Sequence, residues 1–350
     1  MRTVEWDYER NEVRLIDQRL LPGELRYNSY ADYKQLAVAI REMVVRGAPA
    51  IGVTGAFGLA LAAQRSRAST KEVLIGEMKE AARVLENARP TAVNLGWGLR
   101  CVMTEVEAYG GEGEGLRIAV IWAAQRMADE DVAINIRMAK HGAALIEDGD
   151  TIIHHCNTGA LAAVDWGTAL GVIRMAHEQG KKVHVLVDET RPRLQGARLT
   201  AWELQRYGIP FDIITDGAAG FFIRSGQVQK TFFGADRVAA NGDVVNKVGT
   251  YMLALAAHDN SIPVFTVVPT STIDLSIANG DQIPIEERNP EEVLDIQVSG
   301  HPVAPIGATA LNPAFDITPH RLLSAIVTEK GIIYPPFDKN LMRVVPSNLK

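Results

Sequence analysis

The first 150 residues are dominated by apolar positions at helical spacing. They begin with an alternation of polar and apolar residues over 4–20, with Asn11 at a turn, which predicts a β-hairpin. Apolar residues three and four apart then predict a series of helices over 30–45, 49–63, 69–87, a stretch ending near Tyr109, and 116–146. The helix over 49–63 has no charge and repeated glycines, so we expect it to be buried against close neighbours.

The pattern changes after residue 150. Apolar runs of strand length now alternate with helical stretches. The runs are TIIHHC, KVHVLVDET, FDIITD, KTFFGAD and IPVFTVV, and the predicted helices cover 160–177, 194–207, a short stretch after FDIITD, and 249–257. Strands this apolar are covered on both faces, and their alternation with helices is typical of a parallel, doubly wound sheet. The predicted fold class is therefore α/β.

The length of 350 residues favours two domains, because one ordinary core does not extend over so long a chain. The glycine-rich segment GGEGEG at 110–115 marks the expected junction. We therefore predict a small α/β N-terminal domain over 1–115. A doubly wound domain over 116–350 would follow and begin with a long connecting helix.

Composition and charge limit the partners. The chain is 47% hydrophobic with a formal net charge of -6, which argues against nucleic acid because phosphate backbones need a basic face. The longest uncharged run, 49–63, is shorter than the roughly 20 residues that span a bilayer, and MRTVEWDYER lacks the apolar centre of a signal peptide. The two cysteines, Cys101 and Cys156, are expected to be reduced thiols in the cytoplasm.

Polar side chains collect where the predicted strands end. Ligands of open parallel sheets bind beyond the carboxyl ends of the strands. The residues found there offer a thiol, carboxylates, amides and a lysine: His155, Cys156, Asn157 and Thr158; Asp188, Glu189, Thr190, Arg191 and Gln195; Asp216; Asp236; and Asn246 with Lys247 at an expected helix start. Each alone is a weak signal, but together they predict one polar rim. Neither G-x-G-x-x-G nor a P-loop occurs in the chain.

The stretch HHCNTG at 154–159 admits a metal site, a reactive thiol or buried structural residues. Alternation along a strand places His154 and Cys156 on one face and His155 on the other. One histidine and one cysteine are half a zinc site, so no metal is predicted and both histidines are interpreted as structural. Cys156 precedes a predicted helix N-terminus, whose partial positive charge favours a thiolate. Cys101, on an apolar stretch of helix, is interpreted as inert.

The motif RGAPAIG at 46–52 predicts an anion site in the first domain. Arg46 and the amides of Gly47 and Ala48 stand just before a helix, where aligned N–H groups and a guanidinium favour an anion. Arg89 precedes a second helix break at RPT. From spacing alone, solvated loop charges are an equal alternative for both arginines, and the recurrence of the pattern favours phosphate.

Six motifs occur in a specific order: RGAPAIG, ARPTAVNLGW, HCNTGALA, DETRPRLQGARLTAWEL, GADRVAANGDVVNKVGTY and NPAFDITPHRL. With them the chain resembles the methylthioribose-1-phosphate isomerase family of methionine salvage over nearly its whole length. The wider superfamily includes ribose-1,5-bisphosphate isomerase and regulatory subunits of a translation initiation exchange factor. The resemblance implies a cytoplasmic, cofactor-free homodimer with a Rossmann-like C-terminal domain and a site between the two domains. His154 replaces a threonine of the family, a departure we expect to be harmless.

The resemblance also implies roles for individual residues. The catalytic cysteine and aspartate of the family correspond to Cys156 and Asp236. Its substrate contacts correspond to Arg46, Gly47, Ala48, Arg89, Gln195, Asn246 and Lys247. These are positions that the strand ends and helix starts also indicate.

The implied reaction converts an aldose 1-phosphate into a ketose 1-phosphate. Asp236 would donate a proton to the ring oxygen, which requires a dry site that keeps its carboxyl group protonated. Hydrogen then moves from C2 to C1, either through an enediol with Cys156 as relay or by a hydride shift. Two further alternatives stay open: a sibling isomerase acting on ribose 1,5-bisphosphate or 5-deoxyribose 1-phosphate, and a non-catalytic regulatory subunit. A thiol hydrolase is disfavoured, because His155 should face away from Cys156.

Overall fold

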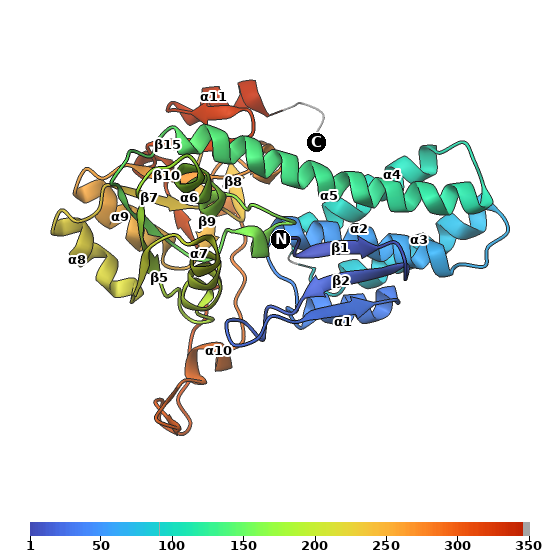
Figure 1. The fold of residues 1–350 in the computed structure, drawn as a ribbon, viewed down its shortest axis with the longest axis horizontal. Helices are drawn as coiled ribbons and strands as arrows, with labels where there is room; N and C mark the ends of the chain where they lie inside the picture. The colour runs from blue at the N-terminus through green and yellow to red at the C-terminus, as the bar shows by residue number, and fades with distance from the viewer. Residues whose placement is uncertain (91, 346–350) are drawn as a thin grey trace. The chain divides into compact units, whose positions relative to one another are not determined.

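The computed structural model describes residues 1–90 and 92–345, which form two compact units (Figure 1). Unit 1 comprises residues 1–135 and 159–167, and unit 2 comprises 136–158 and the chain from 168 onward. These units do not divide the chain at residue 115, because helix α5 (Gly113–Ala143) runs through that position without a break. The boundary between 115 and 116 stays a prediction.

Unit 1 combines a small antiparallel sheet with long helices. The predicted hairpin is present, and a third strand extends it in the order β1-β2-β3. Its elements are β1 (Val4–Asp7), β2 (Glu12–Ile16), β3 (Tyr27–Tyr30), α1 (Tyr33–Arg41), α2 (Ala48–Arg65), α3 (Lys71–Glu86), α4 (Val93–Ala108) and the first part of α5. The third strand is partly exposed, with no apolar alternation to announce it.

Helix α2 is the centre of unit 1 and is buried on almost every side, as its uncharged sequence predicts. Its glycines allow neighbouring helices to approach closely. A Cβ atom on Gly52 would lie 2.9 Å from the carbonyl oxygen of Asn94, in the first turn of α4. The starts of α2 and α4 are therefore packed together.

Unit 2 is built on a seven-stranded sheet in the order β16-β15-β10-β7-β4-β5-β6. Neighbouring strands are parallel except for β16, so the predicted doubly wound α/β fold is confirmed. The strands are β4 (Thr151–His154), β5 (His184–Asp188), β6 (Phe211–Ile214), β7 (Lys230–Phe233), β10 (Val264–Val267), β15 (Ala325–Thr328) and β16 (Gly331–Ile333). The strand order reverses at β4, the position at which such sheets bind ligands.

Helices cover both faces of this sheet. On one face, Ile153 of β4 and Phe233 of β7 belong to a core that includes residues of α8, α9 and α11. The adjacent residue on β7, Phe232, is buried on the opposite face, and β7 also contacts α6. The helices are α6 (Ala169–Glu178), α7 (Ala201–Tyr207), α8 (Ala219–Arg224), α9 (Thr250–Asp259), α10 (Glu291–Leu294) and α11 (Phe337–Val344).

A second sheet in unit 2 was not predicted. It has the order β11-β8-β9-β14, and a two-stranded ribbon, β12-β13, stands apart from it. The strands are β8 (Arg237–Ala239), β9 (Val244–Lys247), β11 (Ile273–Asp274), β12 (Gln297–Val298), β13 (His301–Pro302) and β14 (Phe315–Thr318). Asn246 and Lys247 consequently end strand β9, and their predicted place at a helix start is wrong.

The predicted helix over 160–177 is also wrong in its first half. Residues 160–162 form a single 3-10 turn, and α6 begins at Ala169. The segment 159–167 instead packs within unit 1, where Thr3 Oγ1 donates to the carbonyl oxygen of Ala160 at 2.7 Å and Gln18 Nε2 donates to that of Leu161 at 2.7 Å. Side-chain donors thus bind carbonyl groups that a helix would use.

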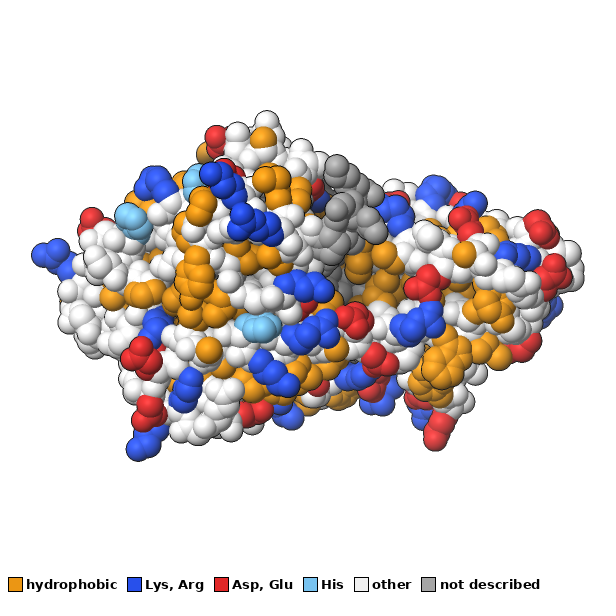
Figure 2. All heavy atoms as spheres, turned by 90° about the horizontal axis from the view of Figure 1, so that it is seen from above, with side chains coloured by type: hydrophobic (Ala, Val, Ile, Leu, Met, Phe, Trp, Pro, Cys, Tyr) orange, Lys and Arg blue, Asp and Glu red, His pale blue; other side chains and the backbone are white. Residues whose placement is uncertain are grey.

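Within the described residues, every helix is too short or too polar to cross a bilayer. On the face shown in Figure 2, acidic and basic side chains alternate with apolar ones and do not form a single basic field.

Candidate active site

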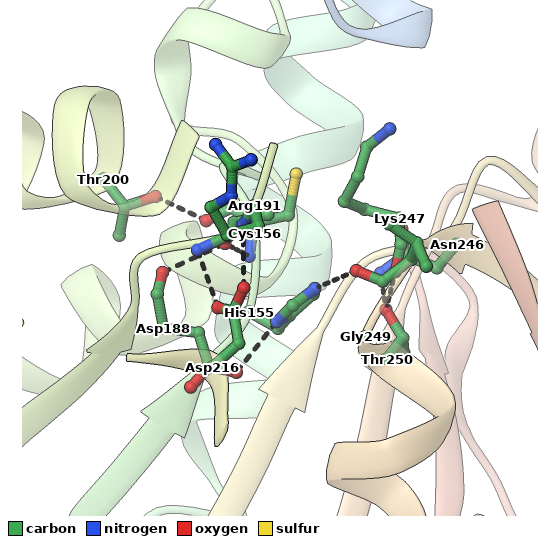
Figure 3. A network of polar contacts seen from close by, with 12 residues as sticks. His155, Cys156, Asp188, Arg191, Thr200, Asp216, Asn246, Lys247, Gly249 and Thr250 are labelled. Carbon is green, nitrogen blue, oxygen red and sulfur yellow. Dashed lines mark hydrogen bonds and ion pairs between the residues drawn. The ribbon is translucent and has the colours of Figure 1, made fainter. Parts of the chain in front are cut away.

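Cys156 stands just beyond β4, at the strand where the order of the large sheet reverses. Its backbone is left-handed, with φ of 67°, a conformation that costs free energy for any residue with a side chain. Hydrogen bonds hold this conformation on both sides. The N–H of Cys156 donates to Thr190 Oγ1 at 2.9 Å, and its carbonyl oxygen accepts from Thr200 Oγ1 at 2.7 Å (Figure 3).

The local setting of Cys156 differs from the predicted one. The next α-helix along the chain starts only at Ala169, so the helix predicted to begin directly after Cys156 is not there. The side chain is only 7% exposed. Cys156 is therefore a shielded thiol on a strained, hydrogen-bonded turn. Cys101, half-buried on α4, has a thiol pKa raised by burial, in keeping with its interpretation as inert.

His155 is completely buried and joins three parts of unit 2. Its Nδ1 lies 2.8 Å from Asp188 Oδ2 at the end of β5, and its Nε2 lies 3.0 Å from the carbonyl oxygen of Val248, just after β9. Burial is the largest single influence and lowers the pKa of the imidazole. The hydrogen bond and charge of Asp188, the charge of Asp216 and the bond to Val248 together outweigh burial, so the pKa of His155 is raised. Burial also raises the pKa of Asp188.

Two further carboxylates surround this histidine. Asp216 accepts from the backbone N–H groups of Thr190 and Arg191, each at 2.7 Å. Asp316 accepts from the N–H of Gly249 at 2.7 Å, and burial raises the pKa of Asp316. His155, Asp188 and Asp216 each have a possible metal-binding atom, and these atoms lie within 4.8 Å of one another. Both ring nitrogens of His155 and both carboxylate oxygens of Asp216, however, already form hydrogen bonds within the protein. The expectation of no metal stays a prediction.

Three predicted substrate contacts are buried on this rim. Gln195 precedes a π-helical turn, Gly196–Thr200, and its Oε1 has no hydrogen-bond partner among the described residues. Asn246 Nδ2 donates to Thr250 Oγ1 at 2.9 Å. Lys247 Nζ donates to the carbonyl oxygen of Ala314 at 2.6 Å and lies 4.5 Å from the ring centre of Phe315.

Asp236 follows β7, which lies directly beside β4 in the sheet. Cys156 and Asp236 therefore follow adjacent strands of the large sheet. The N–H of Asp236 donates to the carbonyl oxygen of Val245 at 2.9 Å, and its side chain is exposed. We expected Asp236 to be shielded from water so that its carboxyl group stays protonated, and this expectation is wrong for the structure described.

The predicted anion-binding residues all belong to unit 1. Gly47 is the N-cap of α2, so the first N–H groups of that helix are not capped by a side chain. Arg46 precedes it, and Arg89 lies between α3 and α4, where the carbonyl oxygen of Arg89 accepts from the N–H of Ala92 at 3.0 Å. Because the starts of α2 and α4 are packed together, both arginines stand at the same end of this helix pair.

The structure thus gathers the predicted residues into two groups, one in each unit. The strand-end group contains Cys156, Gln195, Asp236, Asn246 and Lys247, and the helix-start group contains Arg46, Gly47, Ala48 and Arg89. Sequence reasoning placed Thr190 on the rim, but it missed Thr200 and the pairing of His155 with Asp188. The clustering of DET at 188–190 after a strand was the available signal.

A doubly wound sheet with a cysteine turn at its switch point defines the class of this protein. The chain belongs to the initiation factor 2 subunit family, which it matches over residues 44–335.

Its relatives narrow this class, and the resemblance inferred from the motifs is confirmed. The chain is 50% identical to the methylthioribose-1-phosphate isomerase of Synechococcus sp., covering 96% of each chain. Its structure is similar to that of 5-methylthioribose 1-phosphate isomerase from Pyrococcus horikoshii, with 45% identity, a TM-score of 0.91 and coverage of 98% and 95%. It is also similar to a structure from A. fulgidus described as the delta subunit of translation initiation factor eIF-2B, with 40% identity, a TM-score of 0.89 and coverage of 99% of each chain.

Proposed function

We propose that this protein is an aldose–ketose isomerase that converts 5-methylthioribose 1-phosphate into 5-methylthioribulose 1-phosphate in methionine salvage. The observation that carries the chemistry is the presence of Cys156 and Asp236 after adjacent central strands, at the switch point of the sheet. The choice of sugar follows the relatives of about 50% identity that bear this name.

The helix-start group suits the phosphate. Two arginines and the uncapped N–H groups at the start of α2 offer charge-assisted donors. In the proposal, Arg46, Arg89 and the amides of Gly47 and Ala48 bind the phosphate of the substrate.

The strand-end group suits the sugar and its protons. Gln195, Asn246 and Lys247 provide amide and ammonium groups for hydroxyl oxygens, and the buried Oε1 of Gln195 accepts from a hydroxyl. Asp236 donates a proton to the ring oxygen, which opens the ring. Because Asp236 is exposed here, the bound sugar must exclude water from it before it serves as an acid.

Hydrogen transfer from C2 to C1 takes one of two routes. As a thiolate, Cys156 removes the C2 proton to give an enediol and returns it to C1, while the C2 hydroxyl gives its proton to the carboxylate of Asp236 and becomes the carbonyl group. Alternatively, hydrogen moves as a hydride, and either Cys156 or Asp236 takes only the proton of the C2 hydroxyl. Conversion in deuterium oxide separates the routes, because deuterium at C1 of the product requires an intermediate that exchanges with solvent.

The proposal is tested by turnover. Purified protein should convert 5-methylthioribose 1-phosphate with a higher kcat/KM than ribose 1,5-bisphosphate or 5-deoxyribose 1-phosphate. A preference for either of the other sugars would keep the reaction class and replace the substrate. Complete absence of turnover with all three sugars would overturn the assignment as an isomerase.

A regulatory subunit is the second candidate, favoured by the similarity to the A. fulgidus structure described as a translation initiation factor. The intact cysteine and aspartate favour catalysis, because a binding module does not require a strained thiol at the switch point. Absence of turnover together with binding to a translation initiation factor would support this candidate.

We also propose a cytoplasmic homodimer that needs no cofactor. Both cysteines are free, which suits a reducing compartment. Large apolar side chains of unit 2, among them Phe221 at 67% and Met252 at 65% exposure, are available for a contact with a second copy.

A further inference from the structure

The fully buried His155 has a hydrogen-bonding arrangement that a packing residue does not need. The carbonyl group of Val248 can only accept, so Nε2 of His155 carries a proton. Its Nδ1 faces a carboxylate oxygen of Asp188 at 2.8 Å, and this hydrogen bond requires a second proton between the two atoms. His155 and Asp188 therefore hold one proton more than a neutral imidazole and a carboxylate, and the pair has no net charge.

The surroundings favour this protonated pair. Asp216 and Asp316 both approach the histidine and raise the cost of removing the proton. The fit is close, because a Cβ atom on Gly249 would lie 2.8 Å from Cε1 of the ring. The imidazole is therefore clamped in one orientation.

The bond to Val248 joins two different sheets. His155 directly follows β4 of the seven-stranded sheet, whereas Val248 directly follows β9 of the four-stranded sheet. Cys156 is the next residue on one side, and Lys247 is the preceding residue on the other. One side chain thus ties the cysteine turn to the strand end that carries two predicted substrate contacts.

Asp188 also holds Cys156 through its backbone. Its carbonyl oxygen accepts from Thr190 Oγ1 at 3.0 Å, and the same hydroxyl oxygen accepts from the N–H of Cys156 at 2.9 Å. In Figure 3 the sulfur of Cys156 and the ammonium of Lys247 point to the same side of the network, away from the ring of His155. The histidine consequently acts on the position of these groups and not on the thiol proton.

We propose that His155, clamped by Asp188, is a positioning residue that fixes the Cys156 turn against the strand end bearing Asn246 and Lys247. The inference rests on the proposed isomerase function, because only a reaction at Cys156 requires a fixed distance between the thiol and the side chains of Asn246 and Lys247. Loss of the clamp should displace the thiol relative to the substrate, and misplacement of a reacting group by an ångström costs on the order of 10²-fold in rate.

The test compares His155→Phe with Asp188→Ala and Asp188→Asn, all in a Cys101→Ser background. Each variant is measured for kcat, for KM and for the rate at which iodoacetamide alkylates Cys156. His155→Phe and Asp188→Ala should lower kcat by on the order of 10²-fold, and alkylation should become faster as the turn opens. Asp188→Asn should restore most of the lost kcat and the slow alkylation, because its amide donates to Nδ1 while Nε2 still donates to Val248.

His154→Phe is the matched control. It removes the neighbouring buried histidine, whose Nε2 lies 3.0 Å from Thr158 Oγ1, and it should change kcat far less than His155→Phe. Equal losses in both variants would overturn the proposal, as would wild-type kcat and alkylation in folded His155→Phe. A failure of Asp188→Asn to restore kcat would also overturn it, because the charge would then matter and not the position.

If His155→Phe does not fold, Thr190→Val decides, because it removes the acceptor of the Cys156 N–H and leaves the side chains of His155 and Asp188 unchanged. It should also speed up alkylation and lower kcat, and unchanged values would overturn the proposal. Alkylation needs no substrate, so an inactive wild-type protein would refute the isomerase assignment without affecting this readout.

Discussion

At the scale of single residues, the thiol of Cys156 is the most direct test of the chemistry. Cys156→Ser keeps the shape of the side chain but does not ionise at neutral pH. We expect kcat to fall by on the order of 10²-fold or more while binding of the phosphorylated sugar persists. Steady-state kinetics check this, with Cys101→Ser as the matched control. A Cys156→Ser variant with wild-type kcat would reduce the cysteine to a structural residue.

His154 should make the protein less stable in mild acid. Burial, followed by the charge of His155, lowers the pKa of His154 to about 3 from the usual 6.5. Between these values the unfolded chain binds a proton that the folded chain does not, so the free energy of unfolding falls as pH falls through this window. The slope is up to about 1.4 kcal/mol per pH unit.

The measurement compares melting temperatures of wild type and His154→Phe at about pH 7.5 and about pH 5.5. The wild type should lose more stability than the variant between these conditions, whatever their difference at neutral pH. Equal losses would show that His154 binds its proton as readily in the folded state as in the unfolded state.

Residue identities were easier to predict than their surroundings. Cys156 and Asp236 stood out because each follows a buried strand, and both do follow strands of the large sheet. The pairing of His155 with Asp188 did not stand out, since alternation says which face a side chain occupies but not what lies opposite. The exposure of Asp236 was likewise hidden, because burial depends on neighbours that are distant in sequence.

At the scale of elements, the start of α2 depends on a glycine. Gly47 has a φ of 96°, and a Cβ atom there would lie 2.4 Å from the carbonyl oxygen of Ala162. The clash is with backbone, which cannot move aside, so Gly47→Ala should destabilise the protein by more than about 2 kcal/mol.

Thermal unfolding checks this prediction against Gly76→Ala in α3. An added Cβ atom at Gly76 meets nothing within 4 Å, so the free energy of unfolding of this variant should rise by about 0.5–1 kcal/mol. A Gly47→Ala variant as stable as the wild type would mean that the close approach of residues 47 and 162 is dispensable.

Arg46 at the same helix start should govern affinity for the phosphate. Arg46→Ala removes a charge-assisted contact of roughly 1.5–3 kcal/mol and should raise KM with a smaller effect on kcat. Initial rates with varied sugar phosphate measure this, with the exposed Arg83 of α3 replaced as a control. An unchanged KM would remove Arg46 from the phosphate site.

Helices and strands were predicted well where the apolar residues follow one regular spacing over the whole element. Central strands of the large sheet such as β10 are buried on both faces, and α2 and α5 have long uniform patterns. The helix expected over 160–177 failed because the bonds of Ala160 and Leu161 to Thr3 and Gln18 link residues over 140 positions apart. The second sheet was missed because its strands are two to four residues long and show no usable period.

At the scale of the whole molecule, we expect two copies to associate. Ile213, Phe221 and Met252 of unit 2 are each at least half exposed, and a twofold dimer is the commonest closed assembly that would bury such side chains. Light scattering at micromolar concentration should give about twice the chain mass of 38.1 kDa. A single species with the mass of one chain would contradict the prediction. If the protein is a dimer, Phe221→Glu should shift the equilibrium toward the monomer.

The segment 159–167 has a consequence for biosynthesis. Residues 1–135 leave the ribosome first, but unit 1 lacks the segment that bonds to Thr3, Gln18 and Asp131 until residue 167 has emerged. By then β4 and Cys156 have already been synthesised. Unit 1 therefore cannot finish folding as an independent N-terminal product, and a gene cut after residue 135 should yield a fragment that aggregates or is degraded unless residues 159–167 are supplied with it.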